Sequence, residues 1–196
     1  MILITSIKNL KAHNLTKAKT DVRYYLMGVC FTGSEIWSTN GHVAMRSSDK
    51  LNDLLTKPVI VGLGRMTTVR GAETAVIDTD AGICYFIPQV IDKRADLDMI
   101  DYKADRLDVC TASVIDGNFP DLNRVFPPEN AEPGPVSVIG FNTEYLKLTS
   151  DVAKVLKLKH PYATINFQGD NTKAGIFIIT EPAGTTHKIA IMPVRI

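Results

Sequence analysis

Hydrophobic residues occur along the chain in short runs separated by turn-forming residues, and the runs follow a similar order three times. The first passage begins with a predicted strand at residues 1–5. Residues 6–19 contain neither glycine nor proline and begin at Ser6, a plausible N-cap, so a helix is expected there. Asn40-Gly41 is a pair typical of a hairpin turn. Strands rich in aromatic and β-branched residues are predicted around it, at residues 23–31, 36–39 and 42–46.

The second passage repeats this order with weaker signals. Strands are predicted at residues 58–61, 74–77, 82–87 and 107–115, with a helix candidate at residues 63–70. Residues 88–106 carry several aspartates among basic residues, which is typical of a solvated surface loop. A calcium-binding loop would need a glycine at its sixth position and a glutamate at its twelfth, and this segment has neither.

A proline-rich segment marks the clearest boundary in the chain. The sequence therefore divides into residues 1–127, a linker at 128–135, and residues 136–196. The third passage follows this linker. It contains a predicted strand at 136–140 and a predicted helix at 142–157. Three further strands are predicted at residues 163–167, 175–180 and 188–192.

The helix expected at 142–157 is amphipathic at 100° per residue. Its apolar side combines Tyr145, Thr149, Val152 and Leu156. Its opposite side carries Lys147, Lys154 and Lys157, with Asp151 as the one acid among them. The helix expected at residues 6–19 also carries lysines and no acid. One lysine-rich face is most often a solvated surface, but two such faces at equivalent places of a repeat favour a binding surface for an anion.

Composition narrows the class of protein. The chain has 196 residues, of which 45% are hydrophobic and 22% charged, as in an ordinary globular protein. No apolar run is long enough to span a bilayer, and the N-terminus lacks a signal-peptide pattern. The net charge of +1 excludes a strongly basic, histone-like protein. The odd number of cysteines, Cys30, Cys84 and Cys110, argues against a disulfide framework and favours the cytoplasm.

Six segments, taken together, resemble the bacterial sliding clamp, the beta subunit of DNA polymerase III. These segments are residues 21–26, 38–42, 114–121, 124–127, 140–145 and 191–196. Residues 1–127 are similar to the complete middle domain of that clamp. Residues 136–196 are similar to the second half of its last domain. The resemblance implies an α+β DNA-clamp fold of repeated β-α-β-β-β half-domains, with one complete clamp domain and one half-domain in this chain.

The resemblance also implies a function. A sliding clamp is a non-catalytic ring that encircles double-stranded DNA without sequence preference and tethers DNA polymerase and the clamp loader through short peptides. A ring of the family's size holds twelve half-domains, and this chain supplies three, so a closed homotetramer is expected. No cofactor, metal or membrane is expected. The shortened form suggests a phage or mobile-element protein that works in the host cytoplasm, close to the nucleoid.

Two sets of residues follow from the resemblance. The expected DNA-binding cations are Lys8, Lys11, Lys17, Lys19, Arg65, Arg70, Lys147 and Lys154. The expected peptide pocket consists of Leu26, Thr39, Gly41, His42, Pro120, Arg124, Val125, Asn142, Tyr145, Ala190, Met192 and Pro193. Val43 and Ala44 replace the family's usual arginine and larger aliphatic residue, and Ala190 replaces its usual valine. The family's preferred peptide therefore cannot be assumed for this pocket.

Two other functions remain as alternatives. A clamp-like decoy would bind clamp-recognition peptides or a host clamp without encircling DNA. A metal enzyme would use the carboxylates of residues 92–108. The four histidines show no catalytic motif in the sequence, and neither a phosphate-binding loop nor zinc-ligand spacing is present.

Overall fold

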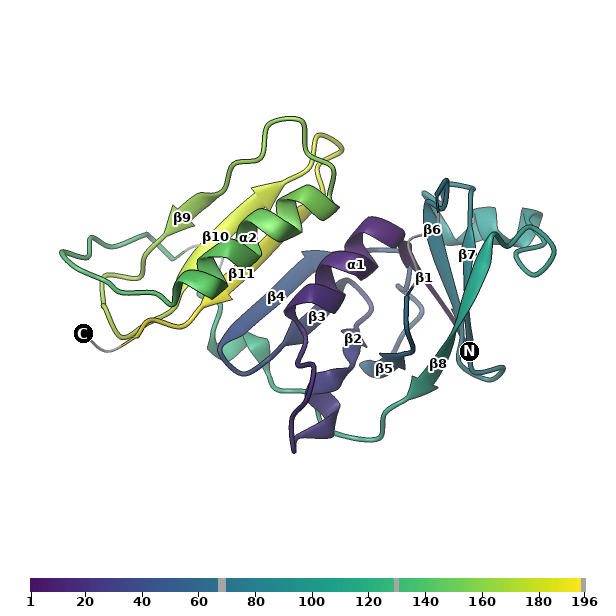
Figure 1. Ribbon diagram of the computed structural model, residues 1–196, viewed down its shortest axis with the longest axis horizontal. Helices are drawn as coiled ribbons and strands as arrows, with labels where there is room; N and C mark the ends of the chain where they lie inside the picture. The colour runs from purple at the N-terminus through teal and green to yellow at the C-terminus, as the bar shows by residue number, and fades with distance from the viewer. Residues whose placement is uncertain (67–69, 129–130, 195–196) are drawn as a thin grey trace.

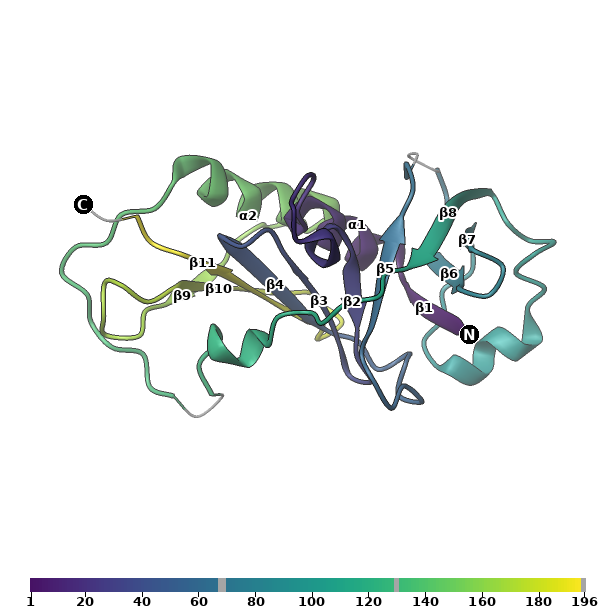
Figure 2. The same ribbon diagram turned by 90° about the horizontal axis from the view of Figure 1, so that it is seen from below.

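A computed structural model describes residues 1–66, 70–128 and 131–194. Its main feature is one long sheet, which both helices cover on the same face (Figure 1 and Figure 2). The sheet has eleven strands in the order β1-β6-β7-β8-β5-β2-β3-β4-β11-β10-β9. Each pair of neighbouring strands is antiparallel. The α+β class predicted from the sequence is confirmed.

The first half-domain contains one helix between a strand and a hairpin. Its elements are β1 (Ile2–Ser6), α1 (Ile7–Thr16), β2 (Val29–Phe31), β3 (Glu35–Thr39) and β4 (Val43–Ser48). The Ser6 side chain caps α1 by accepting a hydrogen bond from the Asn9 N–H at 3.1 Å, as its position predicted. The helix stops at Thr16, before residue 19, because the Ala18 N–H turns back to the carbonyl oxygens of Leu26 and Thr39.

The predicted strand at residues 23–31 is wrong in its first part. Residues Tyr24–Met27 form the 3-10 helix η1, and only Val29–Phe31 joins the sheet. The Asp21 carboxylate accepts hydrogen bonds from the backbone and the guanidinium of Arg23, which bends the chain there. This local turn competes successfully with the strand preference of the two tyrosines.

The second half-domain has strands but no α-helix in its described residues. It comprises β5 (Val59–Leu63), β6 (Thr74–Asp78), β7 (Ile83–Ile87) and β8 (Asp108–Val114). The helix predicted at 63–70 is wrong for residues 63–66, while residues 67–69 lie outside the described part. Leu63 pairs with Ala112 of β8, and the Gly64 N–H continues this ladder to the Thr111 carbonyl at 2.8 Å. The aspartate-rich segment contains a second 3-10 helix, η2 (Arg94–Met99).

The two half-domains of residues 1–127 exchange their first strands. β1 leaves the first half-domain and pairs with β6 of the second, with Leu3 opposite Ile77. The first part of β5 pairs with β2 of the first half-domain, with Cys30 opposite Ile60, while its last part stays paired with β8 of its own half-domain. Each half-domain therefore completes the sheet of the other.

The third half-domain follows the short 3-10 helix η3 (Leu122–Arg124) and the linker. It comprises α2 (Thr143–Val155), β9 (Thr164–Asn166), β10 (Gly175–Thr180) and β11 (Thr186–Ile191). The Asn142 side chain caps α2. The strand predicted at 136–140 is not formed, and the segment makes only an isolated bridge from Gly140 to Val194. A strand is stable only when a neighbour takes its backbone hydrogen bonds, and no backbone hydrogen bond joins residues 136–139 to another segment of the described chain.

Two hydrophobic cores lie between the helices and the sheet. One, under α1, includes Leu10, Phe31 and Phe86, and the other, under α2, includes Val152 and Phe177. Ala12 of α1 belongs to the second core, and the helices contact each other directly. All three cysteines are free and buried. Burial raises the pKa of Cys30 to about 12.

Candidate functional site

The first and third half-domains meet along one strand pair. β4 and β11 are antiparallel neighbours, from His187 opposite Ser47 to Ile191 opposite Val43. The Met192 N–H extends the ladder by donating to the His42 carbonyl at 3.0 Å. This seam joins residues from the two ends of the chain into one continuous sheet.

Three of the predicted pocket residues come together at one end of the seam. The rings of His42 and Tyr145 stack, with centroids 5.7 Å apart and an interplanar angle of 17°. Met192 adjoins them through its hydrogen bond to His42. Gly41 before His42 has φ +90°, a backbone conformation that glycine adopts without strain. The hairpin turn predicted from Asn40-Gly41 thus places His42 beside the first turn of α2.

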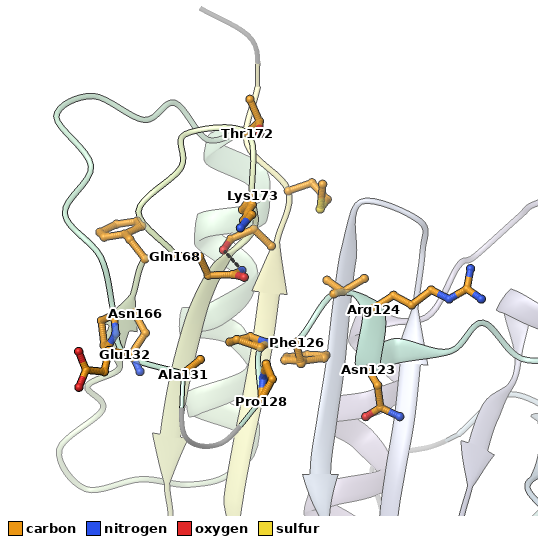
Figure 3. A pocket seen from close by; sticks show the side chains of 16 residues that line it. Asn123, Arg124, Phe126, Pro128, Ala131, Glu132, Asn166, Gln168, Thr172 and Lys173 are labelled. Atoms are coloured by element: carbon orange, nitrogen blue, oxygen red, sulfur yellow. Dashed lines mark hydrogen bonds between the residues drawn. The ribbon is translucent and has the colours of Figure 1, made fainter.

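A cavity of about 540 Å³ opens next to this group, between η3, the linker and the end of β9 (Figure 3). Arg124, Val125, Phe126, Gln168, Ala174 and Met192 are among the residues that line it. Phe126 is only 3% exposed, and the Arg46 guanidinium carbon lies 4.9 Å from the centre of its ring. The Gln168 side chain donates to the Ala174 carbonyl at 3.0 Å, so that side of the cavity has a fixed shape. The cavity combines an apolar floor with polar groups, as peptide and ligand sites do.

The predicted pocket residues are distributed unevenly around this cavity. Arg124, Val125 and Met192 line it, and in Figure 3 the Arg124 side chain points away from the linker. Met192 and Pro193 also line a second hollow, of about 550 Å³, beside residues 138–140. Leu26, Thr39 and Ala190 are buried in this structure.

Pro120 and Asn142 are not among the residues that line this cavity. Pro120 precedes η3, and Asn142 caps α2 through the Glu144 N–H at 2.9 Å. Sequence reasoning missed Phe126 and Gln168, which line the cavity. Phe126 lies inside the segment 124–127 that carried the resemblance, so that motif could have pointed to it. Gln168 offered no signal, because only the fold brings β9 near η3.

Exposed cations lie on α2, on the side away from the sheet. Lys147, Lys154 and Lys157 are exposed, while Val152 and Leu156 are buried, so the predicted division of this helix is confirmed. The Asp151 carboxylate lies 3.8 Å from the Lys147 ammonium and 3.2 Å from that of Lys154. A single acid thus partly offsets two lysines, and the face stays cationic.

The other predicted cations are less uniform. Lys8 and Lys11 are half-buried on α1, and Lys19 lies beyond the helix end. Lys17 is the C-cap residue, and burial lowers the pKa of its ammonium group. Arg65 and Arg70 are exposed on the connection between β5 and β6, not on a helix. Lys8, Lys11, Lys147 and Lys154 therefore form the cationic group on the two helices, here called the lysine face.

A chain of buried hydrogen bonds crosses the seam. His187 Nε2 lies 2.9 Å from Glu181 Oε1, and His187 Nδ1 lies 2.7 Å from Ser47 Oγ. Ser47 Oγ is 2.9 Å from His13 Nε2, and His13 Nδ1 is 2.8 Å from Ser38 Oγ. The two histidines and two serines are 0% exposed. No local sequence pattern pointed to a shared partner of His13 and His187.

The direction of these bonds follows from the Glu181 carboxylate, which can only accept when it is ionised. His187 then donates from Nε2 and accepts the Ser47 hydroxyl at Nδ1. Ser47 in turn accepts from His13 Nε2–H, and His13 Nδ1 accepts from Ser38. His13 is neutral in this arrangement. Burial, and secondarily the neighbouring His187, holds the pKa of His13 well below its usual value. Because both histidines and both serines are closed to solvent, this cluster holds the seam together and offers no place for a substrate.

The described residues contain no helix both long and apolar enough to cross a membrane.

No protein-family model matches the sequence, and no curated protein sequence matches it either.

Solved bacterial sliding clamps match the whole chain in structure. The DNA polymerase sliding clamp of Caulobacter crescentus aligns with a TM-score of 0.57 and 18% identity, covering 100% of this chain and 65% of that one. The griselimycin-bound clamp of Bartonella birtlesii gives 0.57 and 14%, with 100% and 66% coverage. The DNA polymerase III beta subunit of Thermotoga maritima gives 0.56 and 13%, again with 100% and 66%.

This chain spans about two thirds of the length of those clamps, 65–66%, and the identities of 13–18% make the likeness one of fold. The strand order, the exchanged first strands and the two helices on one face are thus the features of a known architecture. The expected fold is confirmed: over all of its length, this chain has the fold of the bacterial DNA polymerase III beta sliding clamps.

Proposed function

We propose that this chain is a DNA sliding clamp, which encircles duplex DNA as a homo-oligomeric ring and tethers replication proteins. The observation that carries the proposal is the arrangement of the lysine face. Both helices lie on one face of a continuous sheet (Figure 2), and of their four lysines Lys147 and Lys154 are exposed and Lys8 and Lys11 half-buried. Lysines meet DNA phosphates as mobile charges and read no base sequence, which suits a protein that must slide.

The ring would be closed by copies of the same chain. Three half-domains share one sheet, and a ring of the size expected from the resemblance needs twelve, so four chains would complete it. Closed symmetry is the usual result when identical chains associate through their own surfaces. The helices would line the opening, and the sheet would form the outer wall.

Tethering would use the cavity beside the seam. Phe126, Val125 and Met192 offer an apolar floor for a leucine or phenylalanine side chain, and Gln168 and Arg124 lie at its edges. A few buried anchors supply most of the binding energy in sites of this kind. DNA polymerase and a clamp loader are the proposed partners.

The ring is tested by its hold on circular DNA. Protein assembled in the presence of a nicked circular plasmid should remain with the plasmid through gel filtration at high salt. Cutting the plasmid once should release it, because a closed ring can leave DNA only over an end. Native mass spectrometry without DNA should show four chains. A persistent monomer, or equal loss from circular and linear DNA, would refute encirclement, and peptide binding without it would favour the decoy.

The pocket is tested by placing a charge in it. Met192→Asp should weaken the binding of fluorescent peptides that carry leucine and phenylalanine anchors at least about tenfold, a loss of roughly 1.4 kcal/mol. The change should not unfold the chain, because Met192 is already 40% exposed. Fluorescence anisotropy measures the affinity.

Met99→Asp is the matched control, since Met99 is 89% exposed in η2, far along the chain from the pocket. It should leave the peptide affinity unchanged. Equal affinities for Met192→Asp and Met99→Asp would remove the cavity as the tethering site.

A further inference from the structure

The long sheet has two ends, and one of them is closed by side chains. At the β1 end, the Asn52 amide accepts the Ile4 N–H at 2.9 Å and donates to the Ile4 carbonyl at 2.8 Å. The Arg94 guanidinium donates to the Ile2 carbonyl at 3.0 Å. Side chains thus occupy the backbone groups that an added strand would need, so another chain has nothing to pair with there.

The opposite end, at β9, is open. Within the described residues, β9 pairs only with β10, and no backbone hydrogen bond reaches the outer edge of Thr164–Asn166 itself. The Gly134 N–H donates to the Phe167 carbonyl at 2.8 Å, just past the end of the strand. Ile165 lies opposite Phe177, so both side chains point to the face that α2 covers. Ile165 is nevertheless 45% exposed. The sheet and the core under α2 therefore both end at β9 without a cover.

The segment 136–140, like the edge of β9, lacks a partner strand. It is apolar, it is not helical, and residues 136–139 make no backbone hydrogen bond within the described part of the chain. Val138 is 60% exposed. Neither this segment nor β9 carries a charged residue, so their pairing would bring no like charges together.

The position of this segment matches that of the exchanged first strands. β1 runs directly into the N-cap of α1, and residues 136–140 run into Asn142, the N-cap of α2. β5 pairs at its end with β8, the last strand of its own half-domain. Gly140 makes the equivalent bridge to Val194, just after β11. In residues 1–127 each first strand then adds to the sister half-domain, but the third half-domain has no sister in this chain.

We propose that residues 136–140 of two copies of this chain exchange, each adding antiparallel to the open edge of β9 in the other. The exchange repeats between chains what β1 and β6 do within one. It also covers Ile165 and completes the core under α2. The role of this exchange in closing a ring rests on the proposed clamp function. The exchange itself does not, since two chains can pair in this way without DNA.

Lysine substitutions at the two edges test the exchange. Ile165→Lys and Val138→Lys should each raise the dissociation constant of the contact at least tenfold, because lysine on an edge strand opposes pairing. Both side chains are exposed in the single chain, so the variants should fold, which circular dichroism checks. Sedimentation without DNA should show the assembly falling to half its mass or less. Val22→Lys, at a 97% exposed site, is the control and should keep the full assembly.

Cross-linking identifies the paired segments directly. Val138→Cys chains mixed with Ile165→Cys chains should give a covalent dimer with a short bismaleimide, while either variant alone should give far less. The native cysteines are buried and should react little. No increase in the mixture, or full assembly of both lysine variants, would overturn the exchange. If the exchange is found but the wild-type protein leaves circular DNA as fast as linear DNA, the exchange stands and the clamp function fails.

Discussion

Replacing Lys8, Lys11, Lys147 and Lys154 by glutamine is expected to weaken binding to duplex DNA by roughly 10²–10³-fold at physiological salt. Each lysine that neutralises a phosphate releases a counterion, and the slope of log K against log salt changes by about 0.9 per contact. Loss of the lysine face should therefore make this slope shallower by about 3.6. Fluorescence anisotropy with duplexes of unrelated sequence, at several salt concentrations, measures both quantities.

Two double variants distinguish an effect of the lysine face on DNA binding from an effect of the chain's total charge. Lys147→Gln/Lys154→Gln and Lys93→Gln/Lys188→Gln remove the same charge. Lys188 neighbours Ile189, which packs under α2, so Lys188 points to the outer face of the sheet. Lys93 lies at the start of η2. Only the α2 pair should change the salt slope, and equal changes for both pairs would show that DNA does not meet the helices.

The second large effect concerns the buried hydrogen-bond chain at the seam. His13→Ala should lower the free energy of unfolding at pH 7.5 by roughly 2–4 kcal/mol, because it leaves the Ser38 and Ser47 hydroxyls short of partners and opens a cavity. Urea unfolding measures the loss. His160→Ala is the control, since His160 is exposed, and it should cost almost nothing.

The same chain predicts a loss of stability in acid. The pKa of His13 is lower in the folded chain than in the unfolded one, so the unfolded chain binds the proton more readily. The stabilising contribution is complete above about pH 6.5 and is lost as the pH falls below it, by at most about 1.4 kcal/mol per pH unit. His13→Gln should flatten this dependence, while His160→Gln should retain it. An unchanged slope in His13→Gln would show that another group titrates.

Short-range sequence patterns predicted the elements whose limits are set by neighbouring residues in the chain. β10 has the predicted bounds, because its apolar run is flanked by clear turn sequences. α2 begins one residue after its predicted start because Asn142 serves as its cap, and a cap and a helix face are encoded within a few neighbouring residues. Ser6 and Asn40-Gly41 act locally in the same way. The DNA-clamp fold also followed from motifs spread along the chain, and the match to solved clamps confirms it.

The tertiary structure alone decided where distant segments pair. Residues 63–64 extend a strand because β8 lies beside them, and residues 136–140 form no strand because nothing does. His13 and His187 meet through Ser47 only because β4 and β11 are neighbours. Caps, turns and helix faces depend on residues close in sequence, so they can be read from it. Strand partners and buried polar contacts depend on which surfaces meet, and that is settled by the folded chain as a whole.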